Sequence, residues 1–509
     1  MKHALSVTRE QDFAAWYQAV IAEADLAEES GVRGCMVIRP WGYGIWERIQ
    51  RLLDDRIKAT GHENCYFPLF IPLSYFAKEA EHVEGFAKEM AVVTHHRLIA
   101  DGKGGLTPDP AAKLEEPLVV RPTSETVIGT AFARWVQSWR DLPVLINQWA
   151  NVVRWEMRTR MFLRTSEFLW QEGHTAHATA DEAREETLKM LEVYRDFAET
   201  CLALPVVAGE KPENERFPGA VATYSIEAMM QDGKALQAGT SHFLGTNFAH
   251  AQNIRFQNAA GELEYANTTS WGVSTRMIGG VIMVHGDDDG LRVPPRIAPW
   301  QVVIVPMLRD NDEDATVIEY CRDLQRTMSQ AYAFVEPVRA LLDLKPAKAA
   351  TKRWGWIKKG APVIIEVGPR DLASGNVSYI RRDELYRDDG KLNSIIASKD
   401  MTEVIGALLH HIQLNLHDQA TERLRASITP LGDWAAVEAM FGGQEKNPGW
   451  ADVAWSKPTG AALDKVVERL KALKLTLRNA PLGQTGHPDA PCIFTGGTAV
   501  ERVLIGRSY

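Results

Sequence analysis

The stretch from residue 151 to 174 constrains the fold of this chain most, because two extended segments flank a short polar turn. Alternate side chains of an extended segment share one face. Phe168, Trp170, Glu172 and His174 should therefore point to the same side of the second segment. The sequence predicts a hairpin whose one face carries aromatic, acidic and imidazole groups.

The turn of this hairpin is rich in arginine. Arg154 and Glu156 precede it and should share a face, while Arg158, Arg160 and Arg164 lie in the turn or just after it. Guanidinium forks suit carboxylate or phosphate groups, so the stretch favours a site for a small zwitterion and a phosphate. The alternative is a half-solvated hairpin whose surface charge has no function.

Length and composition are those of a multidomain globular protein. A chain of 509 residues is too long for one hydrophobic core. We find no apolar run long enough to cross a bilayer and no leading signal-like segment, so we expect a cytoplasmic protein without a membrane partner. The net charge of −9 argues mildly against nucleic-acid binding, although a local basic face would be sufficient for it.

The hairpin resembles a known family motif. Arg154-Trp155-Glu156 and the run 162–174 (FLRTSEFLWQEGH) resemble motif 2 of class II aminoacyl-tRNA synthetases, which spans about 150–175 here. The second half is similar to prolyl-tRNA synthetases of the archaeal and eukaryotic-like branch. Many members have arginine where this chain has Ser166, and proline is frequent at the position of Met161. The resemblance weakens beyond about residue 400.

Helical spacing is visible in two segments before this motif. Residues 11–30 are predicted to form one amphipathic helix, and apolar residues at 45–57 define a second, followed by a strand at 65–70. The segment 41–72 resembles motif 1, which builds the dimer interface in class II synthetases and so implies a homodimer. An ordinary helix–strand unit is the alternative, since such units are common.

A hydroxyl- and glycine-rich turn at 268–275 is predicted to open an apolar helix that carries one arginine, Arg276. An unpaired buried charge is costly, so Arg276 should face a partner unless it reaches solvent. The segment 268–284 resembles motif 3, whose arginine lies along the ATP triphosphate in that family. The short distance from motif 2 leaves no room for the large editing insertion of the bacterial-type prolyl enzymes.

A strand, a turn and a helix start are predicted around residues 121–125 (RPTSE). The hydroxyls of Thr123 and Ser124 stand where they could cap the helix, and a capping role is compatible with a functional one. The resemblance places Thr123 and Glu125 at the amino-acid pocket of the family. Glu125 would then receive the ammonium group of the substrate.

Small residues together with Gln237, Thr240 and His242 make 234–245 a donor-rich strand or loop, where the backbone could approach a ligand closely. By composition alone a polar loop is favoured over a binding segment. The matching segment of the family contacts the nucleotide and the prolyl group, which assigns Gln237 and Thr240 to ATP.

Three further segments carry local predictions. Residues 181–202 form an amphipathic helix with Asp181 as N-cap, and 209–219 is a surface loop. The acidic run 287–289 lacks the spacing of a calcium loop and is predicted to be a solvated turn.

Cations and aromatics interleave between residues 345 and 382, a pattern that suits phosphates and unstacked bases. A solvated basic face is the alternative. The segment 359–371 resembles the anticodon-binding domain of the family, and Lys358 and Arg370 are assigned to the anticodon. Ile357 departs from the acidic residue that relatives commonly use in anticodon reading.

Beyond residue 401, relatives often carry a four-cysteine zinc site and end in a tyrosine carboxylate directed toward the active site. Tyr509 is the last residue, but Cys492 is the only cysteine of this region. A structural zinc site needs four ligands, usually rich in thiolate, so we expect no structural zinc. Apolar packing should replace the metal, with four aromatic candidates: Trp434, Phe441, Trp450 and Trp455.

The resemblance as a whole implies an α/β (α+β) protein. A class II antiparallel-sheet catalytic domain would span 1–293, an α/β anticodon-binding domain 299–400, and a small α+β domain 401–509. The implied reaction is ATP-dependent attachment of L-proline to tRNA(Pro) through prolyl-adenylate, with ATP as a substrate and Mg²⁺ as its companion ion.

In such a reaction the amino-acid carboxylate attacks the α-phosphate, and positioning and charge neutralisation carry the rate. Arg154, Glu156 and Arg276 are assigned to catalysis: Arg154 bridges carboxylate and α-phosphate, Arg276 holds the polyphosphate with Arg164, and Glu156 orients the nucleotide or Mg²⁺. Proline would contact Thr123, Glu125, Arg154, Trp170, Glu172, His174 and Ser270. ATP would contact Arg154, Glu156, Arg164, Thr165, Gln237, Thr240 and Arg276.

Two other classes of protein are weighed against this interpretation. A non-catalytic paralogue would bind tRNA or a protein partner, but such proteins usually lose the arginine of motif 2 or motif 3, and Arg154 and Arg276 are both present. An enzyme that loads a carrier protein would use the same adenylation but tends to lack an anticodon domain.

Overall fold

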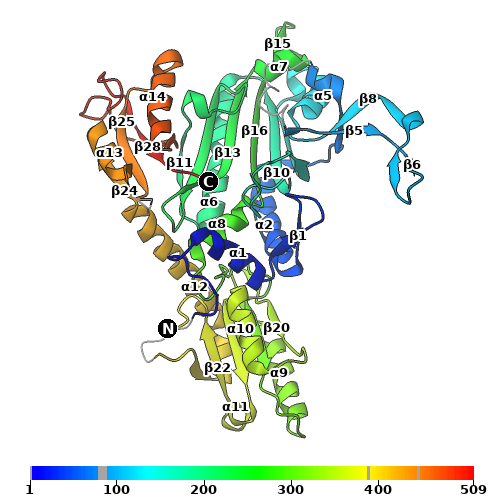
Figure 1. Cartoon of the computed structure of the whole chain (residues 1–509), viewed down its shortest axis with the longest axis vertical. Helices are drawn as coiled ribbons and strands as arrows, with labels where there is room; N and C mark the ends of the chain where they lie inside the picture. The colour runs from blue at the N-terminus through cyan, green and yellow to red at the C-terminus, as the bar shows by residue number, and fades with distance from the viewer. Residues whose placement is uncertain (1–2, 78–88, 387–389, 444–446) are drawn as a thin grey trace.

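A computed structural model describes residues 3–77, 89–386, 390–443 and 447–509. A broad upper part contains the largest sheet, a narrower unit extends below it, and a third unit and a projecting arm lie on opposite sides (Figure 1). Among the described residues, no helix is long and apolar enough to cross a membrane.

The largest sheet has eight strands in the order β27-β11-β12-β13-β16-β10-β9-β3. Neighbouring strands are antiparallel except β3 and β9, which are parallel. β9 and β10 are the two extended segments of the predicted hairpin, which is confirmed. The strands are β3 (Glu63–Asn64), β9 (Val144–Val153), β10 (Glu167–His177), β11 (Val207–Glu210), β12 (Ala222–Met229), β13 (Ala235–Gly245), β16 (Asn267–Ser274) and β27 (Ala480–Pro481).

Helices α2 (Pro40–Ala59), α6 (Ala180–Cys201) and α8 (Arg276–His285) pack with this sheet into one hydrophobic core. The predicted apolar face of 45–57 is buried in α2. The N-cap of α6 is Thr179, which forms a capping box with Glu182, and not Asp181 as predicted. The hydroxyl of Thr179 accepts a hydrogen bond from the Glu182 backbone, whereas Asp181 lies inside the first turn.

Two predictions for the N-terminal region are wrong in their extent. The first helix, α1 (Phe13–Glu23), ends before β1 (Ala27–Glu29), because the backbone reverses at Asp25 with φ of 55°. β1 pairs with β2 (Met36–Ile38). Residues 65–69 are not a strand: the backbone N–H of Phe67 donates to Gln148 Oε1 at 2.6 Å, so a side chain replaces a ladder partner.

The projecting arm is formed by two small sheets (Figure 1). A three-stranded sheet has the order β4-β8-β5, and β6 pairs with β7. Helix α5 (Glu125–Trp135) follows β8 and packs on α7 (Asn247–Gln252), next to the hairpin β14 (Arg255–Gln257) and β15 (Leu263–Tyr265). The arm elements are β4 (Phe70–Pro72), α3 (Leu73–Ala77), β5 (Ala91–His95), β6 (Leu98–Ala100), β7 (Leu106–Pro108) and β8 (Lys113–Val120).

The lower unit contains a five-stranded sheet in the order β20-β17-β21-β22-β23. β20, β17 and β21 are parallel, while β22 and β23 add antiparallel. The α/β class predicted for this region is confirmed. The strands are β17 (Val302–Pro306), β20 (Ala340–Leu342), β21 (Val363–Val367), β22 (Asn376–Arg381) and β23 (Ser394–Ala397). The helices are α9 (Asp314–Met328), α10 (Ala349–Lys359) and α11 (Pro369–Ser374), and a short pair, β18 (Tyr332–Ala333) and β19 (Glu336–Pro337), lies beside them.

Helix α12 (Ser398–Ala426) leads from the lower unit to a four-stranded sheet in the order β24-β25-β28-β26. The predicted boundary at residue 400 falls inside α12, and the proposed division into domains stays a prediction. This unit consists of β24 (Ile428–Leu431), α13 (Trp434–Phe441), β25 (Trp450–Trp455), α14 (Gly460–Ala472), β26 (Thr476–Leu477) and β28 (Glu501–Gly506).

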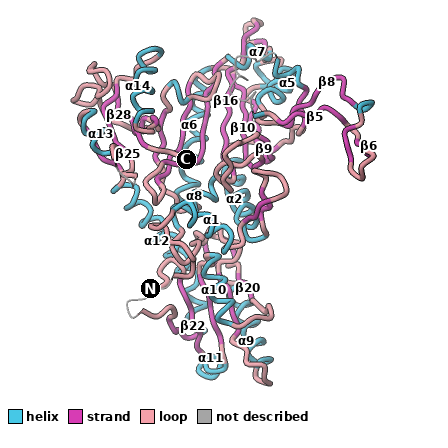
Figure 2. The backbone as a smooth tube through the Cα atoms, viewed as in Figure 1, coloured by secondary structure: helices cyan, strands magenta, loops and turns pink. Residues whose placement is uncertain are grey.

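The aromatic candidates of this last unit divide between two clusters. Trp434, Phe441 and Trp455 pack in its core together with Cys492, as predicted for the replacement of a metal. Trp450 does not join them, because it faces a cluster with Met229 and other residues at the junction with the large sheet. Figure 2 shows the chain end close to the strands of that sheet, and the backbone N–H of Tyr509 donates to the Ala235 carbonyl at 3.1 Å.

Candidate active site

The register of the central strands brings distant residues into rows on the sheet. His174 of β10 lies opposite Ser270 of β16, which lies opposite His242 of β13. In the adjacent row, Glu172 lies opposite Gly272, and Gly272 opposite Thr240. Directly opposed residues in antiparallel strands share a face. The hairpin face predicted from alternation is therefore continued across β16 and β13.

A cavity of about 250 Å³ lies on this face. Its lining includes most of the predicted proline and ATP residues, namely Thr123, Glu125, Arg154, Trp170, Glu172, His174, Gln237, Thr240, Ser270 and Arg276. The structure thus brings together residues from motif 2, motif 3, β13 and the start of α5. The segment 234–245, for which the sequence left strand and loop open, is strand β13. The predicted turn at 268–275 is instead strand β16 as far as Ser274.

Glu172 is fixed by three side chains. Ser124 Oγ donates to its Oε1 at 2.5 Å, Gln148 Nε2 donates to the same oxygen at 2.7 Å, and His174 Nε2 lies 3.0 Å from its Oε2. The predicted capping role of Ser124 is wrong, because this hydroxyl turns to Glu172 and makes no cap bond. The Thr123 hydroxyl donates to Glu125 Oε2. Two buried, oriented carboxylates therefore stand at one end of the cavity.

His174 belongs to the same cluster. Burial would lower the pKa of its imidazole, but the hydrogen bond and charge of Glu172 outweigh burial and raise that pKa above its ordinary value. The neighbouring Glu172 thus favours the protonated form of the His174 imidazole, against the effect of burial.

Arg154 lies between these carboxylates and the aromatic wall. Its Nε donates to the Pro122 carbonyl at 2.9 Å, and its guanidinium carbon is 5.6 Å from the ring centres of both Phe168 and Trp170. Burial lowers the pKa of Arg154, while the charges of Glu125 and Glu172 oppose that shift. The guanidinium is thus held in place at the cavity, and its planar fork suits a carboxylate or phosphate.

Arg276 begins α8, and its Nε donates to the Leu163 carbonyl at 3.2 Å. Burial, and then repulsion from Arg164 and Arg154, lower the pKa of Arg276 to about 10. Like charges that crowd in a buried site destabilise it unless an anion is present. Arg154 and Arg276 in the cavity, with the charge of Arg164 nearby, therefore favour a ligand with several negative charges.

Four lining residues carry a buried polar atom without a hydrogen-bond partner among the described residues: Trp170 Nε1, Arg216 Nε, Ser270 Oγ and Trp271 Nε1. Unpaired buried polar groups cost free energy, and native proteins hold few of them. A polar ligand that reaches any of these atoms would give it a partner.

Three predicted residues do not line the cavity. Glu156 and Arg164 lie in the loop between β9 and β10, where Arg164 Nη1 is 3.7 Å from Glu156 Oε2. Thr165 is buried and lines a separate cavity, beside Arg33, Cys35 and Arg160. Arg164 still acts on the site through its charge, because it contributes to the lowered pKa of Arg276.

One wall of the cavity was missed by sequence reasoning. The segment predicted as a surface loop contributes Glu215, Arg216 and Phe217 to the lining. Phe217 stacks on His242, with ring centres 4.6 Å apart, and Thr223 Oγ1 lies 3.0 Å from His242 Nδ1. Burial lowers the pKa of His242 to about 3, so this imidazole is neutral. In the sequence, the signal for this wall was the group of polar residues around His242 in β13.

The two residues assigned to the anticodon are not brought together. Lys358 lies at the end of α10, where its Nζ is 2.7 Å from Glu23 Oε2 of α1. Arg370 is exposed on α11, at the far end of the lower unit from the cavity (Figure 1). Ile357, the departure noted in the sequence, is fully buried.

Two domain families and several known proteins match this chain. Residues 111–285 match the tRNA synthetase class II core domain (G, H, P, S and T), and residues 301–398 match the anticodon binding domain. The proline–tRNA ligase of Sphingomonas elodea is 74% identical over all of both chains. Those of Sphingopyxis alaskensis and Erythrobacter litoralis are 70% and 67% identical, over all of this chain and 96% and 99% of theirs. The predicted class II fold is confirmed, and the chain belongs to the proline–tRNA ligase family.

Proposed function

We propose that this chain activates L-proline with ATP in the cavity and transfers the prolyl group to tRNA(Pro). The observation that carries the proposal is the placement of two oriented carboxylates, Glu125 and Glu172, beside the guanidinium groups of Arg154 and Arg276 in one cavity. A zwitterion needs one partner of each sign, and a nucleoside triphosphate needs several cations.

Proline is assigned to the carboxylate end. Glu125 receives the ammonium group, and Trp170, His174 and Ser270 form the walls of the pocket with Thr123 and Glu172. Arg154 binds the carboxylate of proline and holds it against the α-phosphate. Aromatic walls suit the apolar ring of proline, and a fixed carboxylate orients the amine.

ATP is assigned to the opposite end, with Arg276 and Arg164 along its phosphates and Gln237 and Thr240 as further contacts. Thr165 is left out of this assignment, because it lines a separate cavity. Mg²⁺ usually takes most of its ligands from water and substrate phosphates and only one or two from protein carboxylates. The described residues contain no cluster of three potential metal ligands, which fits such a shared site. Glu156 is the carboxylate that we assign to the ion or the nucleotide.

The purified chain tests this proposal in two assays. Proline-dependent ATP–pyrophosphate exchange reports the activation step, and charging of tRNA(Pro) reports the transfer. We expect both activities. Exchange without charging would favour an enzyme that loads a carrier protein, and neither activity would favour a non-catalytic paralogue.

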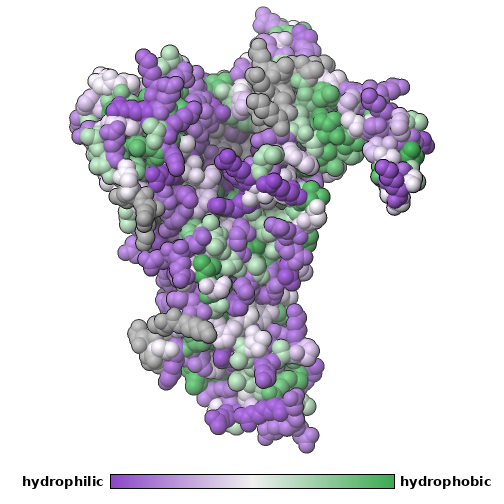
Figure 3. Space-filling model, viewed as in Figure 1, coloured by the Kyte–Doolittle hydropathy of each residue, from purple (hydrophilic) through white to green (hydrophobic). Residues whose placement is uncertain are grey.

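We also propose that the active form is a homodimer, as motif 1 implies. Tyr66 and Phe70 of that segment are exposed, and so are Leu98 and Leu106 of the arm. Figure 3 shows hydrophobic residues exposed where β5 and β8 approach α5. Monomers rarely expose extended apolar patches. Sedimentation velocity should give the mass of a dimer, and a monomer at micromolar concentration would contradict it.

Arg370 and Lys358 remain our proposed anticodon contacts, and a cytoplasmic location stays a prediction.

We expect the purified protein to fold and charge tRNA without stoichiometric zinc. Cys492 is buried, and hydrogen bonds from Ser456 and Thr495 outweigh the effect of burial and lower the pKa of its thiol. Two hydroxyls thus stand near the sulfur, and hydroxyls are not the thiolate or imidazole ligands of a structural zinc site. Elemental analysis checks this prediction. One zinc per chain, lost together with thermal stability on chelation, would contradict it.

A further inference from the structure

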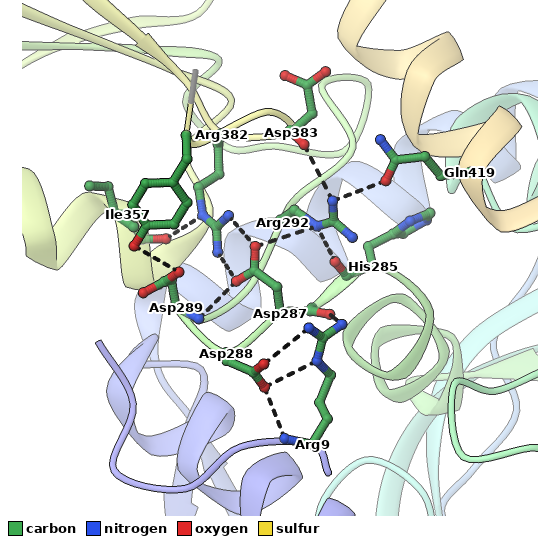
Figure 4. A network of polar contacts seen from close by, with 12 residues as sticks. Arg9, His285, Asp287, Asp288, Asp289, Arg292, Ile357, Arg382, Asp383 and Gln419 are labelled. Carbon is green, nitrogen blue, oxygen red and sulfur yellow. Dashed lines mark hydrogen bonds and ion pairs between the residues drawn. The ribbon is translucent and has the colours of Figure 1, made fainter. Parts of the chain in front are cut away.

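An ion-pair network outside the cavity joins the end of α8 to the lower unit (Figure 4). Asp287 follows α8 after one residue and accepts hydrogen bonds from Arg382: Nη1 to Oδ2 at 2.7 Å and Nη2 to Oδ1 at 2.6 Å. Arg382 directly follows β22, and its side chain is only 1% exposed. The predicted solvated turn at 287–289 is wrong, because a guanidinium from a distant segment covers it.

Arg382 and Asp287 each make a further hydrogen bond with another segment. Arg382 Nε donates to the Ile357 carbonyl of α10 at 2.8 Å, and Trp16 Nε1 donates to the Asp287 carbonyl at 2.9 Å. Burial would raise the pKa of Asp287, but the charge and hydrogen bonds of Arg382 outweigh it, and the pKa lies below its ordinary value. The carboxylate is therefore charged at neutral pH.

Asp288 and the nearby Arg292 connect further segments to the same network. Arg9 donates through Nε and Nη2 to the two oxygens of Asp288, each at 3.1 Å. Arg292 donates to the His285 carbonyl, and its Nη1 donates to the Asp383 carbonyl at 3.3 Å. The N-terminal segment, the end of α8 and the end of β22 thus meet at one network.

Apolar packing also holds the two units together, since Trp356, Ile357 and Ile380 of the lower unit belong to the same core cluster as the upper helices. Hydrophobic packing is non-directional, however, and does not by itself set an angle between two bodies. A two-point pair between a planar fork and a carboxylate is directional. Other directional contacts also join the units, among them Lys358 with Glu23 and Arg48 with Glu336. The pair of Asp287 with Arg382 differs from these in being bidentate with an almost fully buried guanidinium, and we therefore take it as a contact that fixes the orientation of the lower unit.

We propose that Asp287 is a positioning residue for tRNA, because its pair with Arg382 orients the lower unit so that one tRNA reaches both that unit and the cavity. This inference rests on the proposed function. Two linked binding sites reinforce each other only when the geometry allows both to be occupied together. Activation of proline needs the cavity alone, so it does not depend on this orientation.

The test compares Asp287→Asn, Arg382→Gln and the double variant in two assays. We expect proline-dependent ATP–pyrophosphate exchange within about twofold of the parent for all three, since the reacting groups are untouched. The KM for tRNA in charging should rise at least about tenfold, with kcat changed less, because the pair acts on a second site. The KM of the double variant for tRNA should be no higher than that of the more impaired single variant, since both changes remove the same interaction.

The matched control is Asp452→Asn. The Asp452 carboxylate pairs with Arg502 Nε at 2.8 Å inside the four-stranded sheet, so its loss removes an aspartate–arginine pair that does not join two units. We expect both assays to stay at the parental level. Circular dichroism checks the fold of every variant. If Asp287→Asn unfolds, Arg382→Lys keeps the charge without the two-point geometry and should give the same split between the assays.

Two results would overturn the proposal. Charging with a parental KM for tRNA would show that the pair does not orient the lower unit. A loss of exchange by the same factor as charging would place its effect on α8 and the cavity instead. Failure of the proposed function is distinguishable, since the parent itself would then show no exchange or no charging.

Discussion

Replacement of Arg154 by alanine is expected to lower proline-dependent ATP–pyrophosphate exchange by about 10²–10³-fold or more, the usual loss when a group that stabilises transition-state charge is removed. Arg154 is held at the cavity by its bond to the Pro122 carbonyl and by the rings of Phe168 and Trp170. We assign its guanidinium to the charge that develops at the α-phosphate.

The fold should survive this change. The change removes the donation from Arg154 Nε to the Pro122 carbonyl, and such a bond contributes about 1 kcal/mol to stability. Circular dichroism and thermal unfolding should therefore stay near the parent while exchange is lost. Arg195→Ala is the matched control, since Arg195 pairs with Glu192 on the outer surface of α6. Exchange by Arg154→Ala within about tenfold of the parent would contradict the assignment, since that loss is well below the usual one.

Replacement of Glu227 by glutamine is expected to lower the free energy of unfolding by about 3–5 kcal/mol, as when one partner of a buried ion pair is removed. Glu227 of β12 is fully buried between two cations. Lys211 Nζ lies 2.8 Å from its Oε1, and Arg478 Nη2, from the loop after β26, lies 2.7 Å from its Oε2. Glutamine keeps the shape of the side chain but leaves two buried cations without a counter-charge.

The pH dependence of stability follows from the same group. Burial raises the pKa of Glu227, but the charges of Arg478 and Lys211 outweigh burial and lower that pKa to about 2. A carboxyl with a lowered pKa in the folded state contributes stability above its unfolded pKa and loses it as the pH falls. The contribution of Glu227 should therefore be complete above about pH 5 and decline toward pH 2.

Urea unfolding followed by tryptophan fluorescence checks both expectations. The difference between Glu227→Gln and the parent should be largest at neutral pH and shrink in acid, because protonation removes the same charge in the parent. Glu192→Gln is the control, since it breaks an exposed pair on α6 and should change stability by less than about 1 kcal/mol. Equal stability of the two variants at pH 7 would show that the buried charge is not needed.

Much of the candidate site could be predicted from the sequence. Strand alternation alone placed Phe168, Trp170, Glu172 and His174 on one face, because the side-chain period of a strand depends only on near neighbours. The segment containing Arg276 was linked to this face by its resemblance to motif 3, and not by any local pattern. The buried stripe of α2 was predictable for the same reason as the strand, since a helix repeats its faces within a few residues.

Other parts of the site were decided by the tertiary structure. Phe217 and Arg216 lie in a polar, proline-containing segment that reads as a surface loop, and only the pairing of β12 with β13 brings that segment to His242. The roles of the Ser124 hydroxyl and the 287–289 turn were wrongly predicted because their partners, Glu172 and Arg382, are distant in sequence.

The same reason applies to the ion pairs that join the units. Asp287 with Arg382, and Glu227 with Arg478, connect residues 95 and 251 positions apart. A charged residue in a sequence predicts solvent exposure, because burial of an unpaired charge is costly. Whether a counter-charge covers it depends on how separate sheets are docked, and that docking is set by long-range packing that no local periodicity encodes. The sequence by itself therefore determined the β9–β10 hairpin, the buried stripe of α2 and the chemistry of one face, and only the tertiary structure decided which charges are buried together.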